Sequence, residues 1–219
     1  RDRFQIIDKY DDSDVFKAVC GIKDITINQI SALGISKHEL IKCFSLEDIN
    51  EVLKILSTKP LKAKRDRLNI SQNELIELSN SSNFTIGSHT YNHPILANES
   101  HEVVNFEISE SIKYLKNLLN KDVNTLAYPN GIPELDYNQR ELDICKKNNV
   151  KAAYSCEVSY FNKMHSKLAI PRLEISTGGS IKIVMKTIFL NFLKKRLSNP
   201  DMIESRLNIN QLFNKKDLC

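Results

Sequence analysis

The strongest constraint on the fold is an alternation of short apolar segments with amphipathic segments between about residues 83 and 175. The short apolar segments are 84–87, 123–127, 150–155 and 168–175. Between them lie 100–119 and 138–148, whose apolar residues recur every three or four positions, the period of a helix packed on one face. Strands that alternate with helices predict a parallel sheet covered by helices, which is an α/β fold. In such folds the functional groups lie at the carboxyl ends of the strands.

Outside this region the sequence predicts mostly helices. The segments with the helical period are 25–33, 45–56 and 71–78. Ser71 and Glu74 form a capping-box pattern at the start of the third segment. Segment 180–197 is expected to be an amphipathic helix followed by a polar tail. We therefore predict a helical insertion or subdomain at 1–70, an α/β portion at 71–178, and a C-terminal helix and tail at 179–219.

Composition and charge exclude several classes of protein. The chain of 219 residues is 41% hydrophobic and 26% charged, which is typical of a soluble folded protein. Its net charge of +4 comes from 31 basic and 27 acidic residues, and basic runs at 59–67 and 194–196 are typical of solvated helix ends. No apolar run reaches the roughly 20 residues that span a membrane. We therefore expect no nucleic-acid partner, no membrane span and no obligate protein partner.

Five cysteines without a Cys-x-x-Cys pair argue against a disulfide framework and against a thiolate zinc site. Reduced thiols favour the cytoplasm over secretion. The chain starts at Arg1 without a methionine, so we expect a fragment, and the missing signal peptide says little about the compartment.

Two histidines four residues apart follow the first apolar segment, in Ser88-His89-Thr90-Tyr91-Asn92-His93-Pro94. Imidazole is the commonest metal ligand, and positions i and i+4 face one side of a helical turn. Roughly one chain in ten of this composition has such a pair by chance, so the spacing alone also fits a structural pair. The position after a strand and before Pro94 favours a site. We predict that His89 and His93 are metal ligands.

A second motif, Ala127-Tyr128-Pro129-Asn130-Gly131, follows the next apolar segment. The segment from Ser88 to Pro94 resembles the His-[Ser/Thr]-x-x-His-Pro motif of the polysaccharide deacetylase family, carbohydrate esterase family four. The second motif resembles the Arg-x-Pro-Tyr motif of that family in its Tyr-Pro-x-Gly form. The resemblance covers about residues 70 to 175. It implies a distorted (β/α) barrel with fewer than eight repeats, partial here, with residues 1–70 as a mostly helical insertion.

The resemblance also implies a chemistry and a set of site residues. His89 and His93 would bind a catalytic divalent metal, zinc in the first place, with cobalt and nickel as alternatives. The Tyr128 backbone amide would stabilise the oxyanion, and Pro129, in the substrate-binding region, would hold the turn of that amide rigid. From its place just inside the last predicted strand, Arg172 is either a substrate-binding residue that faces the same site or a simple charge at the sheet edge. Because a divalent metal lowers the pKa of bound water toward about 7, it generates a nucleophile for a carbonyl. The implied reaction removes acetyl groups, N-acetyl more than O-acetyl, from an acetylated polysaccharide or glycan precursor.

The chain departs from the family pattern at three places. The family's Thr-Phe-Asp-Asp motif, which supplies the general base and the third metal ligand, has no counterpart in this sequence. The nearest candidate, Tyr10-Asp11-Asp12-Ser13, is predicted to be an acidic turn on the surface. The first strand and its aspartates are expected upstream of Arg1. Ala127 replaces the family's arginine, and His165 is the nearest residue in order to the general-acid histidine. We therefore expect weak metal affinity and little activity from residues 1–219 alone. The alternative function is an inactive, glycan-binding relic of the same fold.

Overall fold

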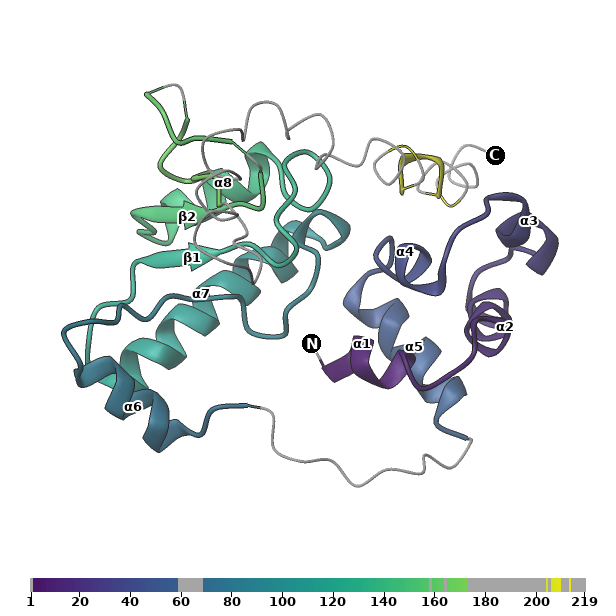
Figure 1. The fold of residues 1–219 in the computed structure, drawn as a ribbon, viewed down its shortest axis with the longest axis horizontal. Helices are drawn as coiled ribbons and strands as arrows, with labels where there is room; N and C mark the ends of the chain where they lie inside the picture. Colours follow the sequence, from purple (N-terminus) through teal and green to yellow (C-terminus); the bar gives the residue numbers. More distant parts are fainter. Residues whose placement is uncertain are drawn as a thin grey trace, which may run out of the picture. The chain divides into compact units, whose positions relative to one another are not determined.

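The computed structural model describes residues 2–58, 69–157, 159–163 and 165–172, with residues 204, 206–209 and 213 near the C-terminus. The chain divides into two compact units, which are Arg1–Asp66 with Asn199–Cys219, and Arg67–Ser198 (Figure 1). The predicted basic runs at 59–67 and 194–196 and the predicted helix at 180–197 lie outside the described residues. No helix in the described ranges is long and apolar enough to cross a membrane.

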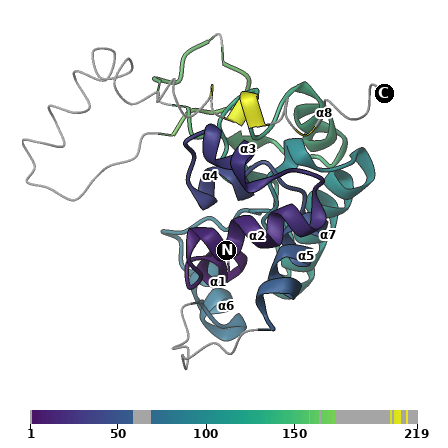
Figure 2. The same cartoon turned by 90° about the vertical axis from the view of Figure 1, so that its right-hand side faces the viewer.

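The first unit is helical. Its helices are α1 (Asp2–Ile7), α2 (Asp12–Ile22), α3 (Ile27–Ala32), α4 (Lys37–Ile41) and α5 (Leu46–Leu56). Three of them begin where a hydroxyl side chain, from Thr26, Ser36 or Ser45, accepts a hydrogen bond from a backbone N–H of the first turn. Helix α5 packs against α1 and α2 (Figure 2). The helices predicted at 25–33 and 45–56 are confirmed as α3 and α5.

Two details of this unit bear on predictions from the sequence. Asp11 and Asp12 are exposed, and Asp11 is the N-cap residue of α2, so the acidic turn lies on the surface as predicted. Arg206 and Ile209 are buried in the unit, and the Arg206 guanidinium donates a hydrogen bond to the Lys42 carbonyl (3.1 Å). The sequence predicts a polar tail after residue 197, but Ile209 packs into the helical core and Arg206 is buried.

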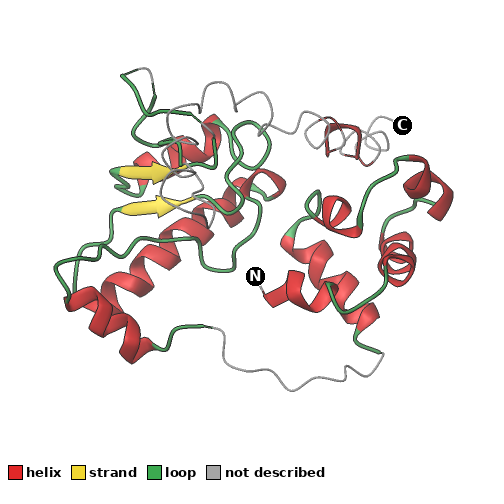
Figure 3. Ribbon diagram, viewed as in Figure 1, coloured by secondary structure: helices red, strands yellow, loops and turns green. Residues whose placement is uncertain are grey.

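The second unit contains the parallel strands (Figure 3). Its elements are α6 (Gln72–Asn80), the 3₁₀ turn η1 (Leu96–Asn98), α7 (His101–Leu119), β1 (Thr125–Ala127), α8 (Gln139–Lys147) and β2 (Ala152–Tyr154). Leu126 of β1 pairs with Ala153 of β2 in parallel register. Single parallel bridges extend the pair on both sides, from Ser88 to Leu126 and from Ile170 to Tyr154.

The outer strands are shorter than predicted. Residues 84–87 are irregular, and only the next residue, Ser88, pairs with β1, so the predicted strand at 84–87 is wrong. The physical reason is that Phe84 is 56% exposed and its apolar run does not enter the core. Of the predicted strand at 168–175, only Ile170 bridges β2, and residues 173–175 lie outside the described residues.

The core of this unit lies between the strands and two helices that contact each other, α7 and α8. It contains Val104 and Ile108 of α7, Ile144 and Cys145 of α8, and Leu126 and Ala153 of the strands. The helical stripe predicted for 100–119 is therefore the buried face of α7, and the helix predicted at 138–148 is α8. The described unit is an α/β fold with two parallel strands, and the partial (β/α) barrel stays a prediction.

Candidate functional site

The two predicted ligand histidines meet at the carboxyl end of β1. His89 lies directly after the bridge residue Ser88, and its Nδ1 is 2.6 Å from the carbonyl oxygen of Ala127, the last residue of β1. The His93 ring stands edge to face against the His89 ring, with 4.7 Å between centroids and 77° between planes. The loop therefore places both imidazoles together at the strand edge where an α/β fold carries its chemistry.

The backbone between the two imidazoles takes an uncommon shape. Thr90 (φ 67°) and His93 (φ 60°) both lie in the left-handed region, which is costly for residues other than glycine. Local hydrogen bonds hold this shape. The Thr90 N–H donates to Ser88 Oγ (3.2 Å), and the His93 N–H donates to Thr90 Oγ1 (3.0 Å). Strained backbone of this kind is enriched at functional sites.

A buried carboxylate on α7 holds the same loop, and the sequence prediction missed it. Glu107 is 1% exposed. Its Oε2 accepts hydrogen bonds from the backbone N–H groups of Tyr91 (2.9 Å) and Asn92 (2.7 Å), and its Oε1 accepts one from Asn92 Nδ2 (2.8 Å). The signal that could have found it is a charged residue on the apolar face of α7, directly before Ile108.

The chemistry of the two imidazoles fits a metal. Because the Ala127 carbonyl can only accept, the proton of a neutral His89 ring lies on Nδ1 and the lone pair on Nε2. A carbonyl on the far ring nitrogen is the usual second contact of a ligand histidine, and imidazole suits zinc, cobalt and nickel. No group of three His, Cys, Asp or Glu side chains that could hold a metal occurs among the described residues.

The turn at 128–131 lies beside the imidazoles, since Tyr128 follows the Ala127 whose carbonyl contacts His89. Asn130 (φ 55°) and Gly131 (φ 80°) make the turn, and the Gly131 N–H donates to the Pro129 carbonyl (2.6 Å). The Tyr128 N–H donates to the Tyr154 carbonyl of β2 (3.1 Å). The Tyr128 N–H, which is predicted to stabilise an oxyanion, therefore already donates a hydrogen bond within the sheet. It would have to give up this hydrogen bond in order to donate to an oxyanion.

The side chain of Tyr128 is structural. Its ring is fully buried and stacks on the Tyr137 ring with 4.0 Å between centroids, and its hydroxyl donates to the Leu168 carbonyl (2.8 Å). Burial is the largest cause that raises the pKa of the Tyr128 hydroxyl, and the neighbouring Cys145 thiol raises it further. A hydroxyl that stays protonated in this way is unsuited to act as a base near neutral pH.

Arg172 lies against this turn, whereas His165 is held in a loop of its own. The Arg172 guanidinium donates to the Ser155 carbonyl (2.8 Å) and contacts Cys156 Sγ (3.1 Å). A side chain at Gly131 would come within 3.5 Å of the same guanidinium. The two ring nitrogens of His165 bond within its own loop, one to Ser159 Oγ and the other to the Asn162 backbone N–H.

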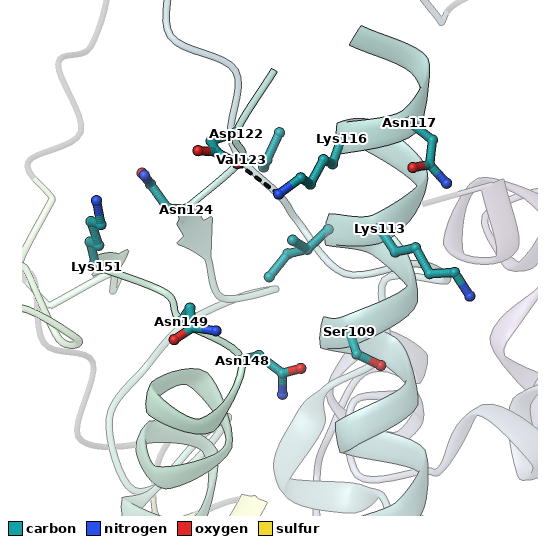
Figure 4. A pocket seen from close by; sticks show the side chains of 11 residues that line it. Ser109, Lys113, Lys116, Asn117, Asp122, Val123, Asn124, Asn148, Asn149 and Lys151 are labelled. Carbon is teal, nitrogen blue, oxygen red and sulfur yellow. Dashed lines mark hydrogen bonds and ion pairs between the residues drawn. The ribbon is translucent and has the colours of Figure 1, made fainter. Parts of the chain in front are cut away.

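A separate cavity of about 350 Å³ lies at the opposite edge of the sheet, at the amino ends of β1 and β2 (Figure 4). Its lining residues are Ser109, Ile112, Lys113, Lys116, Asn117, Asp122, Val123, Asn124, Asn148, Asn149 and Lys151. The cavity lies near the C-terminal ends of two helices, because Asn120 and Asn148 are the C-cap residues of α7 and α8. Lysines near helix C-termini complement the helix dipole, and Lys116 is paired with Asp122 (2.7 Å).

Comparison with known proteins finds similarity to one family over part of the chain. Residues 48–153 match the family model of polysaccharide deacetylase. Among solved structures, the Streptococcus pyogenes deacetylase PplD in complex with acetate is similar, with 26% identity and a TM-score of 0.49. The match covers 54% of this chain and 50% of that one, so the chain spans about half the length of this relative. No curated protein matches the chain. Residues 48–153 are therefore similar to a polysaccharide deacetylase domain, in agreement with the resemblance of the two motifs.

Proposed function

We propose that the protein is a metal-dependent hydrolase that removes acetyl groups from a polysaccharide or glycan precursor, with N-acetyl preferred over O-acetyl. The observation that carries the proposal is the pair of imidazoles, His89 and His93, which meet at the carboxyl end of β1 within the residues that match the deacetylase family model. The match of residues 48–153 to the polysaccharide deacetylase family model supports the proposal.

In this proposal the chain supplies orientation and electrostatics. A divalent metal, when bound, supplies an activated water and an electrophile for the acetyl carbonyl. His89 and His93 would hold it, and the Ala127 carbonyl keeps the proton of a neutral His89 ring on Nδ1, which leaves Nε2 as the atom that would face the metal. Pro129 restricts the turn that follows Tyr128.

The Tyr128 amide is the proposed donor to the oxygen that gains charge as the carbonyl carbon becomes tetrahedral. Such a donor is worth on the order of 3 kcal/mol to the transition state. The loss of its 3.1 Å bond to the Tyr154 carbonyl reduces the net gain. The substrate-binding role of Arg172 is proposed because its guanidinium lies beside the same turn.

The second candidate is a glycan-binding protein that does not hydrolyse. The sequence observation that favours it is Ala127, which stands where the family motif has an arginine. Both candidates predict binding of acetylated sugars, and only the first predicts acetate.

Acetate release from oligomers of N-acetylglucosamine, with added Zn²⁺ or Co²⁺, separates the two candidates. The assay compares wild type with the site variants His89→Ala and His93→Ala. The control is His101→Ala, which changes an exposed histidine at the start of α7. The hydrolase proposal predicts a low metal-dependent rate that both site variants abolish and that His101→Ala leaves unchanged. An O-acetylated oligosaccharide tests the preference for amides. Sugar binding without acetate from either substrate would favour the glycan-binding candidate instead.

A further inference from the structure

We propose that Glu107 is a positioning residue of the histidine site: its carboxylate fixes the backbone of Tyr91 and Asn92 and thereby the relative placement of His89 and His93. The effect on metal binding rests on the proposed function, whereas the effect on the loop rests on the contacts alone. Glu107 lies on α7, a different element from either histidine.

Among the described residues, the carboxylate of Glu107 accepts its hydrogen bonds from one loop. Both oxygens accept hydrogen bonds, at 2.7–2.9 Å, from three N–H groups of Tyr91 and Asn92. These two residues lie between the two imidazoles in the chain. An ionised carboxylate accepts stronger hydrogen bonds than a neutral group does, and burial strengthens them further.

Helix α7 holds the loop at two points. Ser111, which is four residues after Glu107 and on the same face of the helix, contacts Ser88 through their hydroxyl oxygens (2.6 Å). Ser88 precedes His89, and Asn92 precedes His93, so each anchor lies next to one of the two histidines. The helix therefore fixes the ends of the short segment that carries the imidazoles.

The backbone shape of this loop needs support from its surroundings. Thr90 and His93 both have positive φ angles, a backbone region that non-glycine residues rarely occupy unless their surroundings impose it. Tyr91 and Asn92, which lie between Thr90 and His93 in the chain, donate their backbone N–H groups to Glu107. A buried charge without partners would be strongly unfavourable, so the carboxylate and the loop order each other.

The variant Glu107→Gln tests the role with almost no change of volume. A glutamine has one acceptor oxygen, so its NH₂ group must face either the two backbone N–H donors or Asn92 Nδ2. The matched control is Glu141→Gln on α8. Glu141 is also fully buried and accepts a backbone N–H, from Asn138 (2.8 Å), but it pairs with Arg140 and not with the loop.

The experiment measures Co²⁺ affinity by calorimetry, the visible spectrum of bound Co²⁺, and the melting temperature for both variants and for wild type. We expect Glu107→Gln to weaken Co²⁺ binding by about ten- to a hundred-fold and to change the spectrum, as loss of a supporting contact does at metal sites. Glu141→Gln is expected to lower the melting temperature while it keeps wild-type affinity. Wild-type affinity and spectrum in Glu107→Gln would overturn the proposal.

Amide hydrogen exchange separates this proposal from the proposed function, because it needs no metal. We expect faster exchange at Tyr91 and Asn92 in Glu107→Gln, with exchange at Ala127 unchanged. If wild type binds no Co²⁺, the metal assignment fails and exchange alone decides the role of Glu107; unchanged exchange at Tyr91 and Asn92 overturns it. Should Glu107→Gln not fold, Asn92→Ala removes one of the three contacts and is expected to give a smaller effect in the same direction.

Discussion

The close approach of Gly87 to β1 predicts that even an alanine there displaces the histidine loop. A Cβ at Gly87 would lie 2.6 Å from Thr125 Oγ1 and 3.2 Å from the Thr125 carbonyl oxygen. The next residue, Ser88, holds the loop to β1 through two hydrogen bonds, from its N–H to the Thr125 carbonyl and from the Ala127 N–H to its own carbonyl, both 2.8 Å. Because a carbon and an oxygen do not pack at 2.6 Å, Gly87→Ala must shift the Thr125 side chain or this segment, and the contact with the Thr125 carbonyl at 3.2 Å adds to the strain.

The expected magnitude follows from two terms. Overpacking in a tight site costs about 1–3 kcal/mol of stability, and each weakened hydrogen bond costs about 1 kcal/mol. The two costs are not additive here, because the weakened hydrogen bonds are part of the response to overpacking. We therefore expect Gly87→Ala to lower the free energy of unfolding by about 2 kcal/mol and the melting temperature by on the order of 5 °C. Urea unfolding, with amide exchange at Ala127 as the local readout, measures both.

A second substitution makes the test specific. Thr125→Ala removes Oγ1, the atom at 2.6 Å, and leaves the carbonyl contact at 3.2 Å. In Gly87→Ala the added Thr125→Ala change should recover about 1 kcal/mol, a coupling that a double-mutant cycle detects. Wild-type stability in Gly87→Ala, or strictly additive effects of the two substitutions, would show that the segment does not lie this close to the strand.

Two further predictions concern buried side chains of the same unit. Tyr128→Phe removes the hydrogen bond to the Leu168 carbonyl and should cost about 1–2 kcal/mol of stability while acetate release is retained, since only the backbone amide is assigned to chemistry; loss of activity at unchanged stability would contradict this assignment. Burial raises the pKa of the Cys145 thiol to about 11 from an ordinary value near 9. The unfolded thiol therefore loses its proton first as the pH rises, and stability should fall between about pH 9 and 11 by up to roughly 1.4 kcal/mol per pH unit. Cys145→Ala should reduce this slope of melting temperature against pH, and identical slopes would refute the role of Cys145.

The helices could be predicted because their signals are local. Ser45, Ser71, Ser100 and Asn138 are the N-cap residues of four predicted helices, and each side chain accepts a hydrogen bond from the backbone of the first turn. The capping box of Ser71 and Glu74 forms as its pattern indicated. Such contacts span three residues of sequence, so they can be read without knowledge of the rest of the fold.

The strands were harder because their ends depend on neighbours distant in sequence. Strands β1 and β2 have three residues each, and Ser88 and Ile170 join them by single bridges. The apolar character of segment 84–87 says nothing about whether a partner runs alongside, and Phe84 is in fact more than half exposed. Similarly, the residues after 197 look polar, yet Arg206 and Ile209 are buried because their partners lie far away in sequence.

The candidate site shows the same division between local and distant information. His89 and His93 were found from a motif seven residues long. Glu107 and the contact of His89 with the Ala127 carbonyl were not, because α7 and β1 reach the loop from elsewhere in the chain. The engagement of the Tyr128 amide by Tyr154 depends on the pairing of β1 with β2, which no local pattern specifies.

Metal titration of the histidine variants tests the central claim most directly. Isothermal titration with Zn²⁺ or Co²⁺ compares wild type with His89→Ala and His93→Ala, and His101→Ala serves as the control. The account predicts one weak site in wild type and in His101→Ala, and a loss of at least about ten-fold in affinity in each of the other two variants, because each removes one imidazole from the pair. Equal affinity in wild type, His89→Ala and His93→Ala would contradict it.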